Sequence, residues 1–153
     1  MNGYTDYSSP AAGAAASWNN NTQFYVALGS VGSAVWYNVN DYGVTDWLGM
    51  GEPGPTVTSG TYTYGSIRIN AGWLNTRHFG CATPGAANCV YDADNANQKQ
   101  CVSAHEMGHI IGLAHTGAAT NKIMNVDHGA RCHTMALTGA TAGDASDVAA
   151  IYS

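Results

Sequence analysis

The eleven residues from His105 to His115, HEMGHIIGLAH, constrain this chain more than any other feature. On an α-helix, residues four apart lie one turn apart on the same face, so the imidazoles of His105 and His109 can converge on one metal ion. Gly112 favours the positive φ that ends a helix, and such an end would bring His115 back toward the same ion. The stretch therefore predicts a helix ending at Gly112 and a three-histidine metal site.

Glu106 lies inside the same stretch, and its position indicates the chemistry of the metal site. It points roughly 100° around the helix axis from His105, so its carboxylate does not join the ligand pair. From there it can take a proton from a water molecule at the open metal position. Three imidazoles that leave one tetrahedral position open suit zinc better than copper or iron. These residues predict a hydrolytic zinc centre with Glu106 as general base.

The fixed positions of this stretch resemble the extended motif of the metzincin clan of zinc endopeptidases, H-E-x-x-H-x-x-G-x-x-H followed by a methionine turn. Met124 follows His115 across a Gly-, Ala- and Asn-rich stretch and is the expected methionine-turn residue. The resemblance implies that its thioether forms an apolar floor under the three histidines. The alternative is a methionine that only fills core space.

Within the clan the chain looks most like a bacterial matrixin-type catalytic domain. Thr116 is similar to the small hydroxyl residue that matrixins carry after the third histidine, and Val126 stands where astacin-like and serralysin-like members carry tyrosine. Weaker similarities cover residues 41–49, 66–70 and 146–151. The interval between the third histidine and the methionine is longer than in matrixins, and no Pro-x-Tyr element follows. The resemblance therefore implies nothing about the shape of the specificity pocket.

The resemblance implies an α+β, metzincin-like zincin fold, in which a twisted mixed sheet accompanies an N-terminal helix, an active-site helix and a C-terminal helix. It implies one catalytic domain over residues 1–153, with a cleft between an upper part (1–112) and a lower part (113–153). Local signals agree. They predict strands at 23–28, 34–39 and 61–70, an edge strand for substrate within 46–50, and an irregular segment at 72–96. They also predict three helices: one from Pro10 to Trp18 capped by Ser9, the active-site helix at 97–112, and one at 144–152 capped by Asp144. The apolar face of the last helix is expected to carry Val148, Ile151 and Tyr152.

Four cysteines bear on the cellular compartment: Cys81, Cys89, Cys101 and Cys132. None shows the Cys-x-x-Cys spacing of a structural zinc site, so disulfides are favoured over thiolate ligands. We expect Cys81 to pair with Cys89 and Cys101 with Cys132, although four cysteines permit three connectivities. The cysteines and the scarcity of charge predict a secreted, extracellular protein whose precursor carries a signal peptide and a pro-segment.

Charge and hydropathy exclude several classes of partner. The net charge is -5 and only five residues are Lys or Arg, so no basic stripe is available for nucleic acid or for an anionic membrane. No apolar run approaches the roughly 20 residues that a membrane span requires. We expect a monomer whose partner is a protein or peptide substrate.

Two further groups of polar residues are candidate metal ligands. Asp92 and Asp94 have the alternating spacing of carboxylates in calcium loops, but no complete ligand pattern surrounds them. A solvated loop is the prediction there, and a calcium ion is the alternative. His78, His128 and His133 do not match the spacing of the structural zinc site of matrixins. Surface histidines are the prediction, and a second zinc site or a contact to substrate is the alternative.

Taken with the resemblance, the motif predicts a secreted zinc-dependent endopeptidase. One rival is a zinc-bound, catalytically inactive binding module that uses the cleft for recognition. Another is a structural domain in which zinc is closed off by a fourth protein ligand, such as His128 or a cysteine. Glu106 favours the enzyme, because neither rival has a chemical need for that carboxylate.

Overall fold

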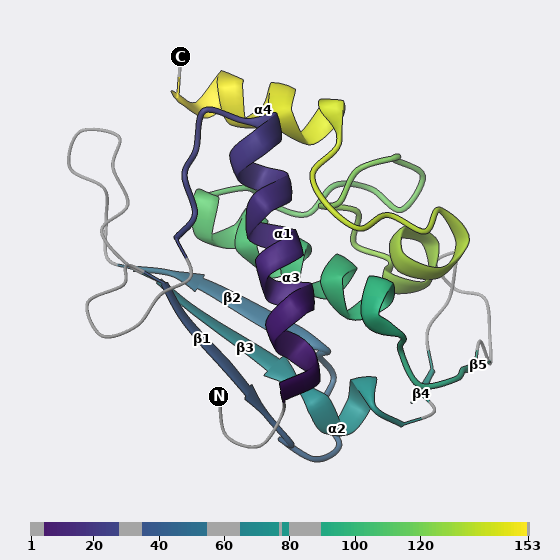
Figure 1. Cartoon of the computed structure of the whole chain (residues 1–153). Helices are drawn as coiled ribbons and strands as arrows, with labels where there is room; N and C mark the ends of the chain where they lie inside the picture. The colour runs from purple at the N-terminus through teal and green to yellow at the C-terminus, as the bar shows by residue number, and fades with distance from the viewer. Residues whose placement is uncertain (1–4, 28–34, 55–64, 77, 80–89, 153) are drawn as a thin grey trace.

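Helices and short strands form an α+β arrangement in the computed structural model of the chain (Figure 1). The structure describes residues 5–27, 35–54, 65–76, 78–79 and 90–152. The α+β class expected from the sequence is confirmed. In chain order the elements are η1 (Thr5–Tyr7), α1 (Ser8–Asn21), β1 (Val35–Asn40), β2 (Gly49–Pro53), β3 (Gly65–Asn70), α2 (Ala71–Leu74), β4 (His78–Phe79), β5 (Val90–Tyr91), α3 (Ala96–Ile111), the π-helix η2 (Gly129–Thr134) and α4 (Ala142–Tyr152).

The larger sheet is mixed and has the strand order β1-β3-β2. Its central strand, β3, runs parallel to β1 and antiparallel to β2, and it buries Ile67 and Ile69. The edge strand β2 spans Gly49–Pro53, so it overlaps the strand predicted within 46–50 only at residues 49 and 50. For the strand predicted at 61–70, the structure has Gly65–Asn70, and residues 61–64 lie outside the described part.

The strand predicted at 23–28 is wrong for residues 23–27, which form no strand. The Asn19 side chain explains the difference. Its Oδ1 accepts a hydrogen bond from the Val26 N–H at 2.6 Å, and its Nδ2 donates to the Val26 carbonyl at 3.1 Å. Because both backbone groups of Val26 are occupied by one side chain, they are not available to a strand ladder.

The first helix begins earlier than the predicted cap at Ser9. A 3₁₀ turn at Thr5–Tyr7 leads directly into α1, whose N-cap position is Tyr7 and has no side-chain capping hydrogen bond. Pro10 then occupies the third helical position. A proline is tolerated there because the first N–H groups of a helix have no intrahelical acceptor.

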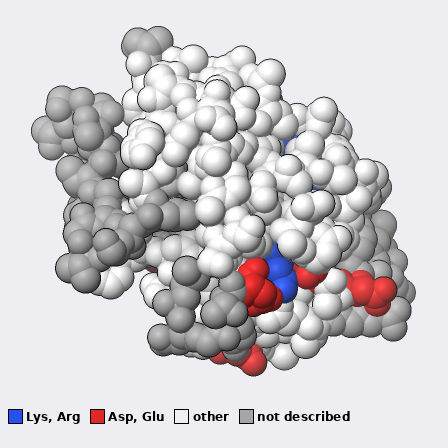
Figure 2. Space-filling model, in the orientation of Figure 1, with Lys and Arg blue, Asp and Glu red and all other residues white. Residues whose placement is uncertain are grey.

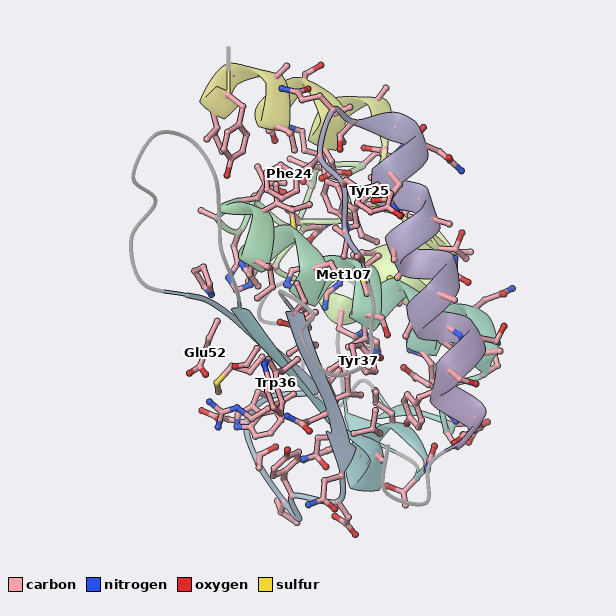
Figure 3. The ribbon with its side chains drawn as sticks, turned by 60° about the vertical axis from the view of Figure 1, so that its left-hand side comes forward. Phe24, Tyr25, Trp36, Tyr37, Glu52 and Met107 are labelled. Carbon is pink, nitrogen blue, oxygen red and sulfur yellow. A yellow bond between two sulfur atoms is a disulfide. The ribbon has the colours of Figure 1, made fainter. Side chains whose placement is uncertain are left out.

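Helix α3 contacts both α1 and the larger sheet, so the hydrophobic core forms around it (Figure 1). From α1, the buried Trp18 donates its indole N–H to the Ala104 carbonyl at 2.9 Å. From β1, Tyr37 points toward α3 and its hydroxyl lies 2.6 Å from that of Ser103, whereas Trp36 points away from the helix (Figure 3). Alternation along β1 thus buries one face of the strand and exposes the other.

Two later segments also differ from expectation. The stretch predicted to be irregular at 72–96 contains the end of α2, the two-stranded β4-β5 sheet and the first residue of α3. Helix α4 begins at Ala142 and not at Asp144. Val148 is buried in it as predicted, and Tyr152 packs against the core and donates its hydroxyl to the Ile111 carbonyl, whereas Ile151 is 49% exposed.

Few charged side chains lie on the face of the molecule drawn in Figure 2, and its Lys and Arg atoms form no continuous patch over the part that is described. Among the described residues, no helix combines the length and apolar character that a membrane span needs.

A disulfide joins Cys101 of α3 to Cys132 of η2, so this predicted pairing is confirmed. The other predicted pair, Cys81 and Cys89, lies outside the described residues. The bond crosses 31 residues of sequence and fixes the segment after Met124 to the middle of α3.

Replacing both Cys101 and Cys132 with alanine should lower the free energy of unfolding by about 3–4 kcal/mol, because the unfolded chain regains the entropy of a loop of this length. Urea unfolding of the parent and the variant measures the difference. Reductant is left out so that the redox state of Cys81 and Cys89 is the same in both proteins. Equal midpoints and slopes for the two proteins would contradict this role.

Candidate metal centre

Helix α3 presents the first two histidines of the predicted site. Asn95 caps it through a capping box with Gln98: the Asn95 side chain accepts from the Gln98 N–H, and the Gln98 side chain accepts from the Asn95 N–H. The helix ends at Gly112, whose φ is 101°, as predicted. The left-handed residue turns the chain back, and His115 follows three residues later.

The three imidazoles face one another through their Nε2 atoms. His115 Nε2 lies 3.1 Å from the Nε2 of His105 and 3.1 Å from that of His109. Ligands at 2.0–2.1 Å from a tetrahedral zinc ion are separated by about 3.3 Å. The three nitrogens are therefore spaced as ligands of one small ion would be.

The second nitrogen of two rings shows why a cation fits. Nδ1 of His105 faces the Ile123 carbonyl at 2.8 Å, and Nδ1 of His109 faces the Leu113 carbonyl at 2.9 Å. A carbonyl only accepts, so both Nδ1 atoms carry the proton and both Nε2 atoms present a lone pair. If His115 Nε2 carries a proton, it can donate a hydrogen bond to the Nε2 lone pair of His105 or of His109, but not to both. A shared cation can accept the lone pairs of all three Nε2 atoms. Partial loss of solvation also lowers the pKa of each ring, most strongly that of the buried His105, which favours neutral imidazoles.

Glu106 lies beside this centre, between α3 and β2, and is 4% exposed. The Gly51 N–H donates to its carboxylate. A Cβ on Gly49 would overlap the Glu106 side chain, and a Cβ on Gly51 would overlap the Glu106 carbonyl, so only glycine allows β2 to approach α3 this closely. Burial raises the pKa of Glu106 to about 7, and the Arg131 charge and the Gly51 N–H oppose the rise. A carboxyl with this pKa can both accept and donate a proton near neutral pH.

The raised pKa of Glu106 predicts a pH-dependent stability in the metal-free protein. The folded state binds this proton more tightly than the unfolded chain, so the stabilisation is complete below about pH 4.5 and is lost as the pH rises through about 7. Relative to Glu106→Gln, the parent should lose up to about 3 kcal/mol between pH 4.5 and pH 8.

Urea unfolding in the presence of chelator, at several pH values, measures this difference. Glu52→Gln is the matched control, since Glu52 is exposed and Arg68 holds the pKa of its carboxyl below the usual value. If the difference in free energy of unfolding between the parent and Glu106→Gln were the same at every pH in this range, the pKa of Glu106 would not be raised.

Met124 is fully buried directly against α3, where a Cβ on Gly108 would overlap its sulfur. The Thr116 N–H donates to the Met124 carbonyl at 2.8 Å, and the Val126 N–H donates to the Thr116 carbonyl at 3.1 Å. These two hydrogen bonds join the strand-like residues after His115 to the methionine segment. They fix the position from which the third imidazole reaches the centre.

Two buried charged residues hold this segment in place: Asp144, which was predicted only as a helix cap, and Arg131, for which no role was predicted. Asp144 accepts from the Ile123 N–H at 2.9 Å and from the Met124 N–H at 3.3 Å. Arg131 donates to the Asn125 carbonyl at 2.7 Å, and burial lowers the pKa of its guanidinium to about 10, so it stays charged at neutral pH. A signal was available for Arg131, since it is one of only five basic residues in the chain.

His128 and His133 were predicted to be surface histidines, and this is wrong: both pack against the buried carboxylate of Asp94. The alternative of a calcium loop is also not supported, because Asp94 faces imidazoles while Asp92 is exposed. The side chain of His78 is outside the described part. The reason for the difference is tertiary: Asp94 precedes α3, and η2 folds back over that end of the helix.

Comparison with known proteins adds no relative to this description. No family model matches the chain, and no curated protein matches it. The chemistry of the centre is therefore inferred from its own residues and their geometry.

Proposed function

We propose that the protein is a zinc-dependent endopeptidase that hydrolyses internal peptide bonds. The observation that carries the proposal is the convergence of three Nε2 lone pairs beside a buried carboxylate that is not part of the ligand set. This combination provides a metal position and an independent proton acceptor, which a purely structural zinc site does not need.

The residues divide the reaction between them. His105, His109 and His115 would hold zinc, which supplies a water molecule of lowered pKa and polarises the scissile carbonyl. Glu106 accepts a proton from the attacking water, and the remaining hydroxide adds to the carbonyl carbon. Glu106 then delivers the proton to the leaving amine as the C–N bond breaks. The Gly51 N–H orients the carboxylate through its hydrogen bond.

The edge of β2 supports a place for the substrate backbone. The Asn70 N–H donates to the Leu48 carbonyl at 2.9 Å, and the antiparallel register pairs Gly49 with Ile69 and Gly51 with Ile67. Backbone hydrogen bonds alternate along such a pair, so the N–H and carbonyl groups of Gly49 and Gly51 face away from β3. The Gly51 N–H is bonded to Glu106, which leaves the Gly49 N–H and the two carbonyls along this edge. Among the described residues, no other strand pairs with that edge. An extended peptide added there would lie beside Glu106.

This assignment agrees with the resemblance to the matrixin-type metzincins. We therefore extend the proposal to a metzincin-like fold in a single domain, with Met124 as the methionine-turn residue. The Cys101–Cys132 disulfide supports an extracellular location, because such bonds persist in oxidising compartments.

Replacing Gly49 with alanine should lower kcat/KM for peptide cleavage by roughly 10–10²-fold without loss of zinc, because the added methyl group displaces the Glu106 side chain. Gly117→Ala is the matched control, since a Cβ there meets open space and the residue has no positive φ. Kinetics on one fluorogenic peptide compare the three proteins. Equal kcat/KM for Gly49→Ala and the parent would argue against a contact between position 49 and the general base.

Cleavage of an unstructured protein, such as denatured casein, by the purified chain tests the proposed function directly. Cleavage that disappears on chelation and returns with zinc is the expected result. An equimolar zinc content at the three histidines without any cleavage would overturn the proposal and favour an inactive zinc-bound binding module.

A further inference from the structure

A second set of metal-binding side chains lies away from the candidate active site. Asp94 immediately precedes the N-cap of α3, whereas His128 and His133 lie at the start of η2 and within it. His128 Nε2 is 3.4 Å from Asp94 Oδ2, His133 Nε2 is 3.3 Å from Asp94 Oδ1, and the two Nε2 atoms are 3.1 Å apart. One carboxylate and two imidazoles thus point at a common position.

The arrangement of these groups has the dimensions of a zinc site. Nitrogen and oxygen ligands at 2.0–2.2 Å from a tetrahedral zinc ion are separated by about 3.3–3.5 Å, and the observed separations are 3.1–3.4 Å. The rings of His128 and His133 are 4.9 Å apart at 83°, and those of His105 and His109 are 4.8 Å apart at 87°. Two histidine pairs from different segments therefore share one mutual orientation.

All three side chains are withdrawn from solvent. The Asp94 side chain has no exposed surface, and those of His128 and His133 are 9% and 13% exposed. A carboxylate is rarely placed in such surroundings unless it is compensated by charge or by a metal, and the buried Arg131 already supplies part of that charge to Asp94. The three side chains are already removed from water in the folded protein, so an ion that binds there does not have to displace water from them.

We propose that Asp94, His128 and His133 bind a second divalent transition-metal ion, with zinc as the best fit to its mixed carboxylate and imidazole ligands. The ion joins the start of α3 to η2. It lies on the same two elements as the Cys101–Cys132 disulfide, so the two links together hold the C-terminal segment against the active-site helix. The proposal is independent of the proposed peptidase activity, because it concerns other ligands and a structural role.

Gln98 determines how readily His133 binds the ion. The Gln98 Oε1 accepts from the Asn95 N–H at 2.8 Å, so its NH₂ group faces His133 Nδ1, also at 2.8 Å. In this arrangement Nδ1 accepts, and the proton of the neutral ring is on Nε2, where a metal would bind. Metal binding requires that proton to move to Nδ1 and the Gln98 amide to turn over. The free energy of zinc coordination is many times that of one helix-capping hydrogen bond, so coordination outweighs this rearrangement.

A glutamate at position 98 removes the conflict. Its carboxylate can accept from both the Asn95 N–H and a protonated His133 Nδ1, which forms the carboxylate–histidine–metal arrangement found around zinc ligands. Gln98→Glu should therefore tighten binding at the second site by roughly tenfold or more. A role for these residues as a hydrogen-bonded cluster alone predicts no such gain.

Metal stoichiometry of the full chain tests the proposal. The protein, stripped by chelation without reductant, is titrated with Co²⁺ and separately with Zn²⁺, and metal content is measured after removal of unbound ion. We expect two equivalents in the parent, one in His115→Gln and one in His133→Gln, and none bound tightly in the double variant. A parent that binds one equivalent, lost completely in His115→Gln, would overturn the second site.

Two proteins keep the test decisive if His133→Gln does not fold. His115→Gln leaves the second cluster intact and must still retain one equivalent, whatever the peptidase assay shows. Gln98→Glu removes no ligand and must bind that equivalent more tightly than its Gln98 parent. An unchanged affinity in Gln98→Glu counts against coordination by His133.

Discussion

Replacing Glu106 with glutamine should lower kcat/KM for peptide cleavage by roughly 10²–10⁴-fold while the zinc content stays at that of the parent. Glu106 is not one of the three groups that converge on the metal position, so its loss leaves the ligands intact. Glutamine keeps the size of the side chain and can still accept from the Gly51 N–H through its amide oxygen. What it cannot do is take a proton from water.

The measurement is steady-state cleavage of a fluorogenic peptide, together with metal analysis of the same samples. Glu52→Gln is the matched control, because Glu52 is an exposed carboxyl of the same strand that approaches Glu106. Cleavage by Glu106→Gln at the rate of the parent would remove Glu106 from the mechanism. Loss of zinc in Glu106→Gln would mean that the carboxylate supports the ligands as well as the reaction.

Replacing His115 with glutamine should abolish cleavage and remove the stabilisation that zinc gives at this site. His115 is exposed, so the substitution should leave the chelator-treated protein within about 0.5 kcal/mol of the chelator-treated parent. With free zinc at a thousand times the dissociation constant of this site, the parent gains about 4 kcal/mol from the bound ion. The variant should lack that gain.

Thermal or urea unfolding with zinc and with chelator gives all four values needed for this comparison. Gly117→Ala, two residues further along the same turn, controls for a change in the exposed segment. An equal zinc-dependent gain in the parent and in His115→Gln would show that the third imidazole does not bind the metal. Any contribution from the Asp94, His128 and His133 cluster is common to both proteins and cancels in the comparison.

The parts of the site that were predicted from sequence are those built from local geometry. Four-residue spacing places His105 and His109 on one face of any helix. Gly112 ends the helix because glycine, unlike residues with a side chain, adopts a φ of 101° without strain. The capping box at Asn95 and Gln98 is equally local, but it was not predicted, and the helix begins at Ala96, one residue before the predicted start. These features involve residues within one or two turns, so their geometry does not depend on which distant segments pack nearby.

The strand predicted at 23–28 shows where local reasoning fails. Its aromatic and β-branched residues have a high strand propensity, but the side chain of Asn19 occupies the backbone of Val26. Propensity reports only how well a side chain suits a half-buried sheet. A single side-chain amide in the right place overrides it.

The sequence by itself determined the helix with its histidines and Glu106, and it favoured the Cys101–Cys132 pair among the alternatives. Only the tertiary structure decided that β2 buries Glu106, that Asp144 and Arg131 hold the methionine segment, and that Asp94 meets two histidines of η2. Backbone spacing within a helix is fixed by its few hydrogen-bonded turns. Burial, and the pKa shifts and contacts that follow from it, depends on which distant segments pack together, and no single segment encodes that.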